Sequence, residues 1–469
     1  MTKRFAIPIL CLAISLAAAA FTPPKPGTPA AKAHAKPAAH KAVAETGPQA
    51  AGRQPLSFHI GAATFTPGGF LDLTSVWRSS DMSGIGTSFS GVPFSDTAAG
   101  QLSSFGESAQ NSRLDLMVSA QPGLETVTAY VEADFLGNAP ANVQVTSHSD
   151  TLRMRLYWVD VKRGGWEILG GQSWSLLTPN RRGLSPLPGN VFYTEDMDTN
   201  YQAGLVWSRD PQLRVIRHFN SHWTLGISLE DPDPYIGPAV TLPNPAYASQ
   251  FDNGANSSAP SSRPDIIAKL AYDGHWAGHL VHGEIAGLSS GFQAVNPTSL
   301  ATTGKNGWGG ELDGNMELLP HLDLLLNGYF SDGGGRYIFG LAPDFVLQPG
   351  GQISPLHSAS TVDGIEWGFR PGWLAYGYYG AVAIGRDYAF TAGGPVGYGF
   401  PGGPESANRT IQEGTAGLIR TFWKNARYGA LEIITQYSYL TRAPWWTPPT
   451  TPNTASVHMV YADLRYVLP

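Results

Sequence analysis

The sequence is most informative through what it lacks. It contains a single cysteine, Cys11, so no intrachain disulfide forms and the fold depends on burial and hydrogen bonding alone. After residue 21 no uninterrupted apolar run reaches 18 residues, which argues against a transmembrane helix. Lysine is scarce beyond residue 53, where four lysines accompany nineteen arginines. This bias favours cations held in fixed, multiply hydrogen-bonded positions.

Charge is unevenly distributed along the chain. The whole sequence has 30 basic and 36 acidic residues, and residues 1–53 contain seven and one of them. Residues 54–469 therefore hold 23 basic and 35 acidic residues, a net charge of −12. A body this acidic disfavours nucleic acid as a partner.

The N-terminus is typical of an exported protein. Two basic residues at positions 3 and 4 precede an uncharged apolar segment that ends in four alanines at 17–20. This pattern predicts a signal peptide at 1–20. Residues 21–57, rich in Ala, Pro and Lys, predict a disordered periplasmic arm. The remainder, 58–469, is predicted to be one folded domain.

The stretch 152–174 predicts two strands joined by a tight turn. Leu152, Met154, Leu156 and Trp158 alternate with Arg153, Arg155 and Tyr157, and the turn contains two consecutive glycines. Side chains alternate between the two faces of a strand, so one face is apolar and the other polar. In a membrane barrel, the first four residues are expected to face lipid and the arginines to face a water-filled lumen.

The same alternation recurs to the end of the chain. With 55 glycines and 37 prolines, the composition favours many short strands over helices. Strands are predicted near 69–79, 111–120, 126–136, 151–162, 165–174, 201–219, 223–230, 264–273, 277–288, 307–318, 321–331, 361–370, 373–385, 410–421, 429–441 and 456–468. Asp210-Pro211 interrupts one of them, which we interpret as a single strand with an irregular start.

The predicted connections alternate in length. Long ones fall near 80–110, 137–150, 175–200, 231–263, 289–306, 332–360, 386–409 and 442–455, and short ones lie between them. Consecutive strands of an up-and-down barrel reverse direction, so every second connection lies at the same end. The sequence therefore predicts an all-β fold: a transmembrane up-and-down antiparallel β-barrel of about 16 strands, with long extracellular loops and short periplasmic turns in the bacterial outer membrane.

Three segments resemble a known family. GFLDLTSVW at 69–77, PQLRVIRHF at 211–219 and HMVYADLRYVLP at 458–469 are similar to the DcaP-like trimeric outer-membrane porins, which are related to the phosphate-selective porins. The resemblance covers roughly 58–469. It implies a sixteen-stranded barrel, a homotrimer and passive uptake of small, often anionic, solutes. The N-terminal arm lacks coiled-coil heptads and the chain ends in Pro469, two departures from that pattern.

Inward-facing charges are the candidate site. Strand parity places arginines and carboxylates on the polar faces, and they form the predicted set of pore-lining residues: Arg113, Asp115, Glu132, Asp134, Arg153, Arg155, Glu167, Arg214, Asp463 and Arg465. Such groups either select solutes by charge or pair with one another and brace the interior. Arg153 and Arg155, about 7 Å apart along the strand, would suit the two ends of a dicarboxylate or a phosphate.

The connection 175–200 adds Arg181 and Arg182 to the set. In the porins that the chain resembles, the third long loop folds inward and narrows the pore; the alternative is an ordinary exposed loop.

No metal, cofactor or catalytic group is predicted. His279 lies on the opposite strand face from His282 and Glu284, and the glycine-rich segment 332–336 lacks the Lys of a phosphate-binding loop.

The sequence therefore predicts a porin, without catalytic activity, that passes small hydrophilic solutes, with a modest preference for small anions such as dicarboxylates or phosphate. Its predicted partners are outer-membrane lipid and small anionic or neutral solutes, and the resemblance implies two further copies of the chain in a homotrimer. Two alternatives stay open: a secreted soluble all-β carbohydrate-binding or hydrolytic protein, and an outer-membrane enzyme or receptor.

Overall fold

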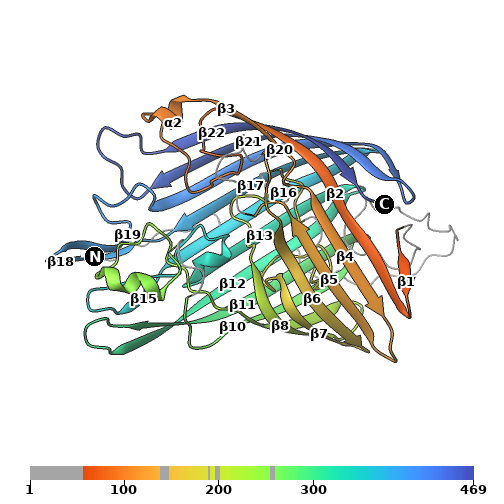
Figure 1. Cartoon of the computed structure of the whole chain (residues 1–469), viewed down its shortest axis with the longest axis horizontal. Coiled ribbons are helices and arrows are strands. Elements are labelled where there is room, and N and C mark those ends of the chain that lie inside the picture. Colours follow the sequence, from red (N-terminus) through yellow and green to blue (C-terminus); the bar gives the residue numbers. More distant parts are fainter. Residues whose placement is uncertain (1–55, 138–146, 188–190, 196–200, 254–258) are drawn as a thin grey trace, which may run out of the picture. The chain divides into compact units, whose positions relative to one another are not determined.

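The computed structural model describes residues 56–137, 147–187, 191–195, 201–253 and 259–469. Its main element is a closed antiparallel barrel (Figure 1). The sixteen strands of the wall are β2 (Ala63–Arg78), β4 (Arg113–Ala120), β5 (Thr126–Asp134), β6 (Arg153–Arg163), β7 (Trp166–Trp174), β8 (Arg209–His218), β9 (Trp223–Glu230), β10 (Asp265–Trp276), β11 (His279–Val295), β12 (Thr302–Leu319), β13 (Leu322–Asp332), β16 (His357–Arg370), β17 (Trp373–Ile384), β20 (Asn408–Asn425), β21 (Gly429–Pro444) and β22 (Ala455–Val467). The predicted fold class and strand number are confirmed.

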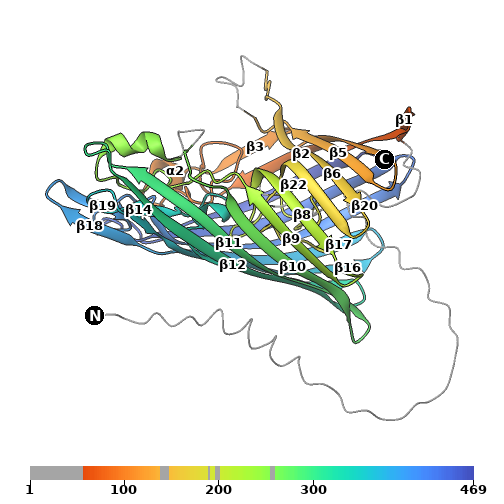
Figure 2. The same ribbon diagram turned by 90° about the horizontal axis from the view of Figure 1, so that it is seen from below.

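The barrel closes where β2 meets both the second and the last strand of the wall. Residues Phe70–Arg78 of β2 pair with β22, and residues Thr64–Phe70 pair with β4. Gly69 lies at the crossover with φ +121°, and a Cβ there would approach the Arg113 carbonyl oxygen to 2.1 Å. The backbone N–H of Leu468 donates to the Gly69 carbonyl at 3.0 Å. The C-terminus therefore lies beside β2, as Figures 1 and 2 both show.

Smaller elements belong to the ends of the barrel. They are β1 (Phe58–Ile60), α2 (Ala98–Gln101), β3 (Ser104–Ser108), the 3-10 turns η1 (Pro245–Gln250) and η2 (Gly335–Tyr337), and the short strands β14 (Phe345–Leu347), β15 (Ile353–Pro355), β18 (Asp387–Thr391) and β19 (Gly394–Tyr398). Phe251 and Phe345 of two long connections pack with Phe292 of β11 in an apolar cluster. Among the described residues, no helix is long and apolar enough to cross a bilayer.

Connection lengths alternate as predicted, with two corrections. The wall strand expected at 201–219 begins only at Arg209, and residues 201–208 belong to the preceding connection. Pro211 nevertheless pairs in register with Gln172, so β8 is one strand and the alternation is preserved. The connection expected at 289–306 shortens to 296–301, because β11 and β12 continue their pairing to Val295 and Thr302.

The outer face of the wall is apolar where lipid is expected. From β8 to β12 the outward positions include Leu213, Ile227, Leu229, Ile266, Ile285 and Leu312, all exposed. Exposed aromatic residues cluster near the short turns: Trp166, Trp223, Trp276, Trp367, Phe369, Phe422 and Trp423. Such girdles mark the membrane–water boundary of outer-membrane barrels.

The spacing of two tryptophan levels matches a bilayer. Trp367 pairs with Leu322, and Trp308 pairs with Asp332, so ten residues of β13 separate the two levels. At about 3.3 Å per residue this is about 33 Å along the strand. A tilt of about 40° reduces it to about 25 Å, the height of the apolar band in such barrels.

One prediction about side-chain direction is wrong for two residues. Met154 is exposed as expected, but Leu156 and Trp158 are buried in the interior while Tyr157 and Val159 face outward. The cause is a register shift: Glu132 pairs with Leu156 and Ala133 with Met154, which leaves Arg155 as an extra residue. A bulge of one residue exchanges the two faces of the strand beyond it.

The predicted signal peptide at 1–20 and all but the last two residues of the predicted arm lie outside the described residues. They stay predictions, while the described barrel begins near the predicted boundary at 58.

Candidate functional site in the barrel interior

The connection between β7 and β8 runs through the barrel. We call residues 175–208 the inner loop; the structure describes 175–187, 191–195 and 201–208 of it. Leu177, Phe192 and Leu205 have no exposed surface and belong to one cluster with inward-facing wall residues such as Ile411 and Val382. Burial of such side chains contributes about 1.5–3 kcal/mol each. The prediction of an inward-folded connection is therefore confirmed for these parts of it.

Polar wall groups hold the irregular backbone of the inner loop. Leu176 N–H donates to Glu230 at 2.8 Å, Gly183 N–H to Asp273 at 3.0 Å and Ala203 N–H to Glu413 at 2.9 Å. Backbone amides in a loop have no ladder partner, and hydrogen bonds to ionised acceptors are about twice as strong as neutral ones. Several carboxylates of the acidic wall thus act as anchors for the loop backbone.

Arg181 of the inner loop forms a two-point ion pair with the wall. Its Nη1 and Nη2 donate to the two carboxylate oxygens of Glu366 on β16, at 2.7 and 2.5 Å. Tyr378 on β17 donates its hydroxyl to the same carboxylate at 2.6 Å. Arg182, next in sequence, is exposed. One arginine of the predicted pair is therefore fixed on the wall while the other is accessible.

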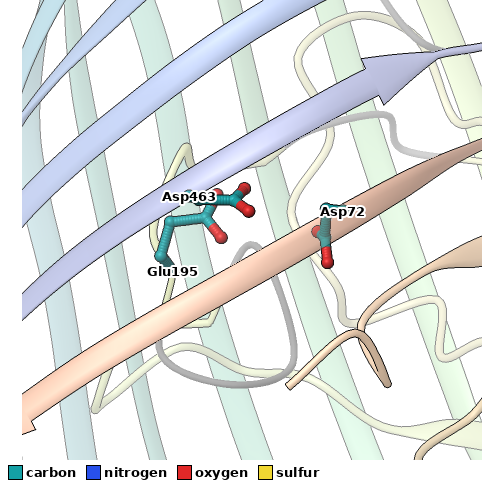
Figure 3. Close-up of side chains that lie close together, drawn as sticks. All are labelled: Asp72, Glu195 and Asp463. Atoms are coloured by element: carbon teal, nitrogen blue, oxygen red, sulfur yellow. The ribbon is translucent and has the colours of Figure 1, made fainter. Parts of the chain in front are cut away.

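A second ion-pair cluster joins the inner loop to the wall where the barrel closes. Arg465 on β22 contacts Asp72 on β2, Glu195 of the inner loop and Asp463 on its own strand, each at 3.0 Å. Figure 3 shows the carboxyl groups of Glu195 and Asp463 close together, with Asp72 on the neighbouring strand. Burial raises the pKa of the Glu195 carboxyl, and the Arg465 guanidinium opposes that effect. One oxygen from each carboxylate lies within 4.8 Å of the others. The Arg465 guanidinium already bridges the three carboxylates, which favours a structural ion-pair cluster over a metal site.

The predicted residues on β4, β5 and β6 form one ion-pair network. Arg155 donates to Glu132 at 2.6 Å and to Asp134 at 2.7 Å. Arg153 donates to both oxygens of Asp134, at 2.9 and 2.6 Å. The Arg113 Nε lies 3.8 Å from Glu132. Half-buried Asp115 faces inward beside them on β4.

Arg155 cannot act as half of a solute clamp. Its side chain has 0% exposed surface, against 29% for Arg153. The bulge and the shared carboxylate bring both guanidinium groups to Asp134, so the two arginines do not present a free pair to a dicarboxylate or a phosphate.

The two remaining predicted residues sit apart from these groups. Glu167 on β7 contacts Lys162 at 2.9 Å and His218 at 3.1 Å. Arg214 on β8 is buried and donates to Gln212 and to the Trp174 carbonyl oxygen. Both hold neighbouring strands together.

Exposure differs systematically between partners in these ion pairs. The cation is the more exposed partner in Arg153–Asp134 (29% against 1%), Arg181–Glu366 (23% against 4%) and Arg465–Asp72 (11% against 0%). Arg155 and Lys269 are exceptions, with no exposed surface. The carboxylates of these three pairs are almost fully buried, which leaves their guanidinium groups nearer to water.

Sequence reasoning missed the residues that anchor the inner loop. Glu230, Asp273, Glu366 and Glu413 all occupy inward positions, and strand parity would have identified them. Their role could not be inferred, because it depends on where the loop backbone passes.

The fold and its exterior define a class. A closed sixteen-stranded antiparallel barrel with an apolar outer band and an aromatic girdle is a protein of the bacterial outer membrane. No protein-family model matches the sequence, and no curated protein matches it.

Similar proteins are found among solved structures. The chain is similar to the outer membrane channel DcaP of Acinetobacter baumannii, with 18% identity, coverage of 87% of this chain and 98% of that one, and a TM-score of 0.64. The anion-selective porin from Comamonas acidovorans is 11% identical over 87% of this chain and 100% of that one, with a TM-score of 0.49. At these identities the likeness shows the fold alone. The resemblance to the DcaP-like fold predicted from three short segments is thus confirmed.

Proposed function

We propose that this protein is a porin through which small hydrophilic solutes diffuse passively. The observation that carries the proposal is the inner loop, which enters a closed membrane barrel and is hydrogen-bonded to its wall from β9 to β22. Such an arrangement narrows a lumen without requiring any catalytic group. The apolar outer band argues against the alternative of a secreted soluble protein, because the surface of a water-soluble protein would not present such a band.

Conductance measurements test the proposal and separate it from an outer-membrane enzyme or receptor. The purified protein, added to planar lipid bilayers in 1 M KCl, should produce uniform conductance steps. Liposomes containing it should swell in isotonic solutions of small sugars and organic acids. Folded protein, verified by a heat-dependent shift in gel mobility, that gives no steps and no swelling would contradict the porin function.

We further propose a modest preference for small anions, including dicarboxylates and phosphate. Its support is the exposure difference within the ion pairs, since a solute meets the cationic partner first. Charges in a narrow lumen are screened less than loop charges, which lose their effect within about 8–10 Å at physiological salt. Half-buried inward carboxylates such as Asp115 and Asp323 keep the preference modest.

Arg153 offers a clean test of selectivity. Arg153→Gln removes the most exposed of these guanidinium groups, while Asp134 keeps Arg155 at 2.7 Å. Reversal potentials in a KCl gradient should shift toward cations in this variant. The matched control is Arg217→Gln, whose side chain lies on the outer face against Trp166 and should leave the potential unchanged. A cation-selective wild type, or equal potentials for both variants, would contradict the proposal.

We also propose that the barrel assembles as a homotrimer through the outer face of β16, β17 and β20. Asp363 faces outward halfway between the two tryptophan levels, opposite Leu326 and Tyr379. Tyr379 donates its hydroxyl to Gln412 on β20 at 2.8 Å. A carboxylate is unfavourable against lipid at this depth, so a protein surface is the better neighbour. In contrast, outward positions of β8 to β12 away from the turns include aliphatic residues such as Leu213, Ile227 and Ile285.

Two alanines on the outer wall provide a matched pair for this test. Ala381→Trp on β17 should obstruct the contact and shift the assembly from trimer to monomer in detergent, as measured by light scattering. Ala268→Trp on β10 places the same side chain toward lipid and should leave the trimer intact. A monomeric wild type, or identical behaviour of the two variants, would refute this interface.

A further inference from the structure

A small cavity lies between the wall and the inner loop. Its volume is about 10 Å³, enough for one water-sized body. Both limbs of the inner loop contribute to its lining through Pro179, Gly204 and Val206. The wall side is built from six residues on three neighbouring strands: Glu311, Asp313, Asn327, Gly328, Tyr329 and Ser360.

The oxygens around this cavity have few partners. Glu311 and Asp313 are 3% and 5% exposed, and within the described residues their four carboxyl oxygens accept no hydrogen bond of regular geometry, although the Lys269 ammonium lies 3.1 Å from Glu311 Oε2. The Ser360 hydroxyl, on a residue that is 8% exposed, has no hydrogen-bond partner there either. An unsatisfied buried polar group costs about 1–3 kcal/mol. Two such groups, the Asp313 carboxylate and the Ser360 hydroxyl, line this cavity beside the ion-paired Glu311, which points to a bound ligand.

Charge at the site is also unbalanced. Lys269 is the cation nearest to the pair, 3.1 Å from Glu311 and 3.7 Å from Asp313. It also binds Glu284 at 2.7 Å and the carbonyl oxygens of Leu177 and Thr178. If all three carboxyl groups are ionised, they and the single ammonium carry a net charge of −2. Next to them, His282 lies between Asp273 and Glu284. A protonated His282 would be balanced by the Asp273 carboxylate, so counting this neighbouring pair does not make the total more positive.

We propose that this cavity binds one calcium ion. Carboxylate, hydroxyl and amide oxygens are hard ligands of the kind that Ca²⁺ prefers. A divalent ion would neutralise the net charge of −2, which a monovalent ion would not. Mg²⁺ retains several bound waters, and a cavity for one water-sized body leaves no room for them.

Calcium at this position would fasten the inner loop to the wall. The ion would lie among β12, β13 and β16 on one side and both limbs of the loop on the other. The site would thus oppose loop movement, whichever solutes cross the barrel. This inference does not rest on the proposed transport function.

Direct binding of Ca²⁺ to the full chain tests the proposal. Protein refolded from the denatured state in detergent carries no lipopolysaccharide, which itself binds divalent ions. After EGTA treatment and its removal, equilibrium dialysis with ⁴⁵Ca²⁺ should show one saturable site per chain. Tb³⁺ luminescence excited through protein aromatic groups should appear on binding and disappear on addition of Ca²⁺.

Three variants make the assignment specific to this cavity. Asp313→Asn should weaken Ca²⁺ binding about tenfold or more, because ligand charge governs affinity. Ser360→Ala, which changes no charge, should weaken it by a smaller factor. Asp323→Asn removes an inward carboxylate of β13 outside the cavity and should bind as the wild type does.

Two sets of results would refute the calcium site. If the wild type shows no saturable site, or if Asp313→Asn and Ser360→Ala both bind like Asp323→Asn, the calcium site is refuted. Should Asp313→Asn fail to give the heat-shifted folded band, Ser360→Ala against Asp323→Asn decides alone.

Discussion

Gly380 on β17 lies close against the backbone of the inner loop. A Cβ at this position would lie 1.8 Å from the Ala203 carbonyl oxygen, whereas real Cβ atoms essentially never approach within 3.0 Å. The variant Gly380→Ala therefore forces a displacement of at least 1.2 Å, the difference between these two distances. Because the strand is fixed by pairing on both sides, the loop must move.

The energetic cost of that movement follows from the hydrogen bonds that would break. Ala203 N–H would leave the Glu413 carboxylate, and the Gln202 side chain would leave the Glu413 carbonyl oxygen. The first bond contributes about 1.5–3 kcal/mol and the second about 1 kcal/mol, so detachment costs roughly 2.5–4 kcal/mol. This is small for a barrel with sixteen paired strands, and we expect the wall to stay folded while the loop moves toward the lumen axis.

Single-channel recordings should reveal this displacement. We expect Gly380→Ala to show a lower conductance than the wild type, with the heat-shifted gel band retained. Gly377→Ala is the matched control, since it lies on the same strand, faces outward and meets only the Thr415 carbonyl oxygen, at 3.8 Å. Conductance equal to that of the control would refute the placement of the inner loop against β17.

The ion pairs and the strand faces support three further predictions. Val159→Arg, which faces lipid on β6, should destabilise the barrel by about 2–4 kcal/mol in urea titrations into lipid vesicles, and a wild-type midpoint would contradict the corrected face assignment. Arg181→Gln should raise conductance by freeing the inner loop from Glu366. Adding Glu366→Gln to this variant should not lower its stability further, and stability losses that add would contradict the ion pair. Arg465→Met leaves three buried carboxylates without their arginine partner and should lower stability by about 3–5 kcal/mol at neutral pH. Because protonation relieves the repulsion among these carboxylates, acidification from pH 8 to 5 should narrow the stability difference between the variant and the wild type. A constant difference would contradict this ion-pair cluster.

The sequence alone determined the architecture. Alternating apolar and polar residues set the strands, and loops that alternate in length set an even number of them, because both patterns follow from local backbone geometry. The last strand illustrates this: strand parity predicts that Asp463 faces inward, and the structure buries Asp463 while it exposes Val460 and Leu464 on the opposite face.

Local parity fails wherever one residue is added to a ladder. Leu156 and Trp158 share the apolar period of Met154, yet the bulge at Arg155 turns them inward. Nothing in the spacing of these residues signals the bulge, because it depends on how β5 and β6 pair.

Only the tertiary structure decided what the inward charges do. The sequence identified Arg155 and Arg465 as inward cations, but whether a cation meets solute or a buried carboxylate depends on distant segments. Arg465 lies 270 positions from Glu195 in the chain and contacts it at 3.0 Å. The same holds for the cavity lined by Glu311, Asp313 and Ser360, which exists because the inner loop crosses the barrel and covers three strands at once. Strand periodicity carries information over a few residues, whereas these contacts are set by the path of a loop through the interior.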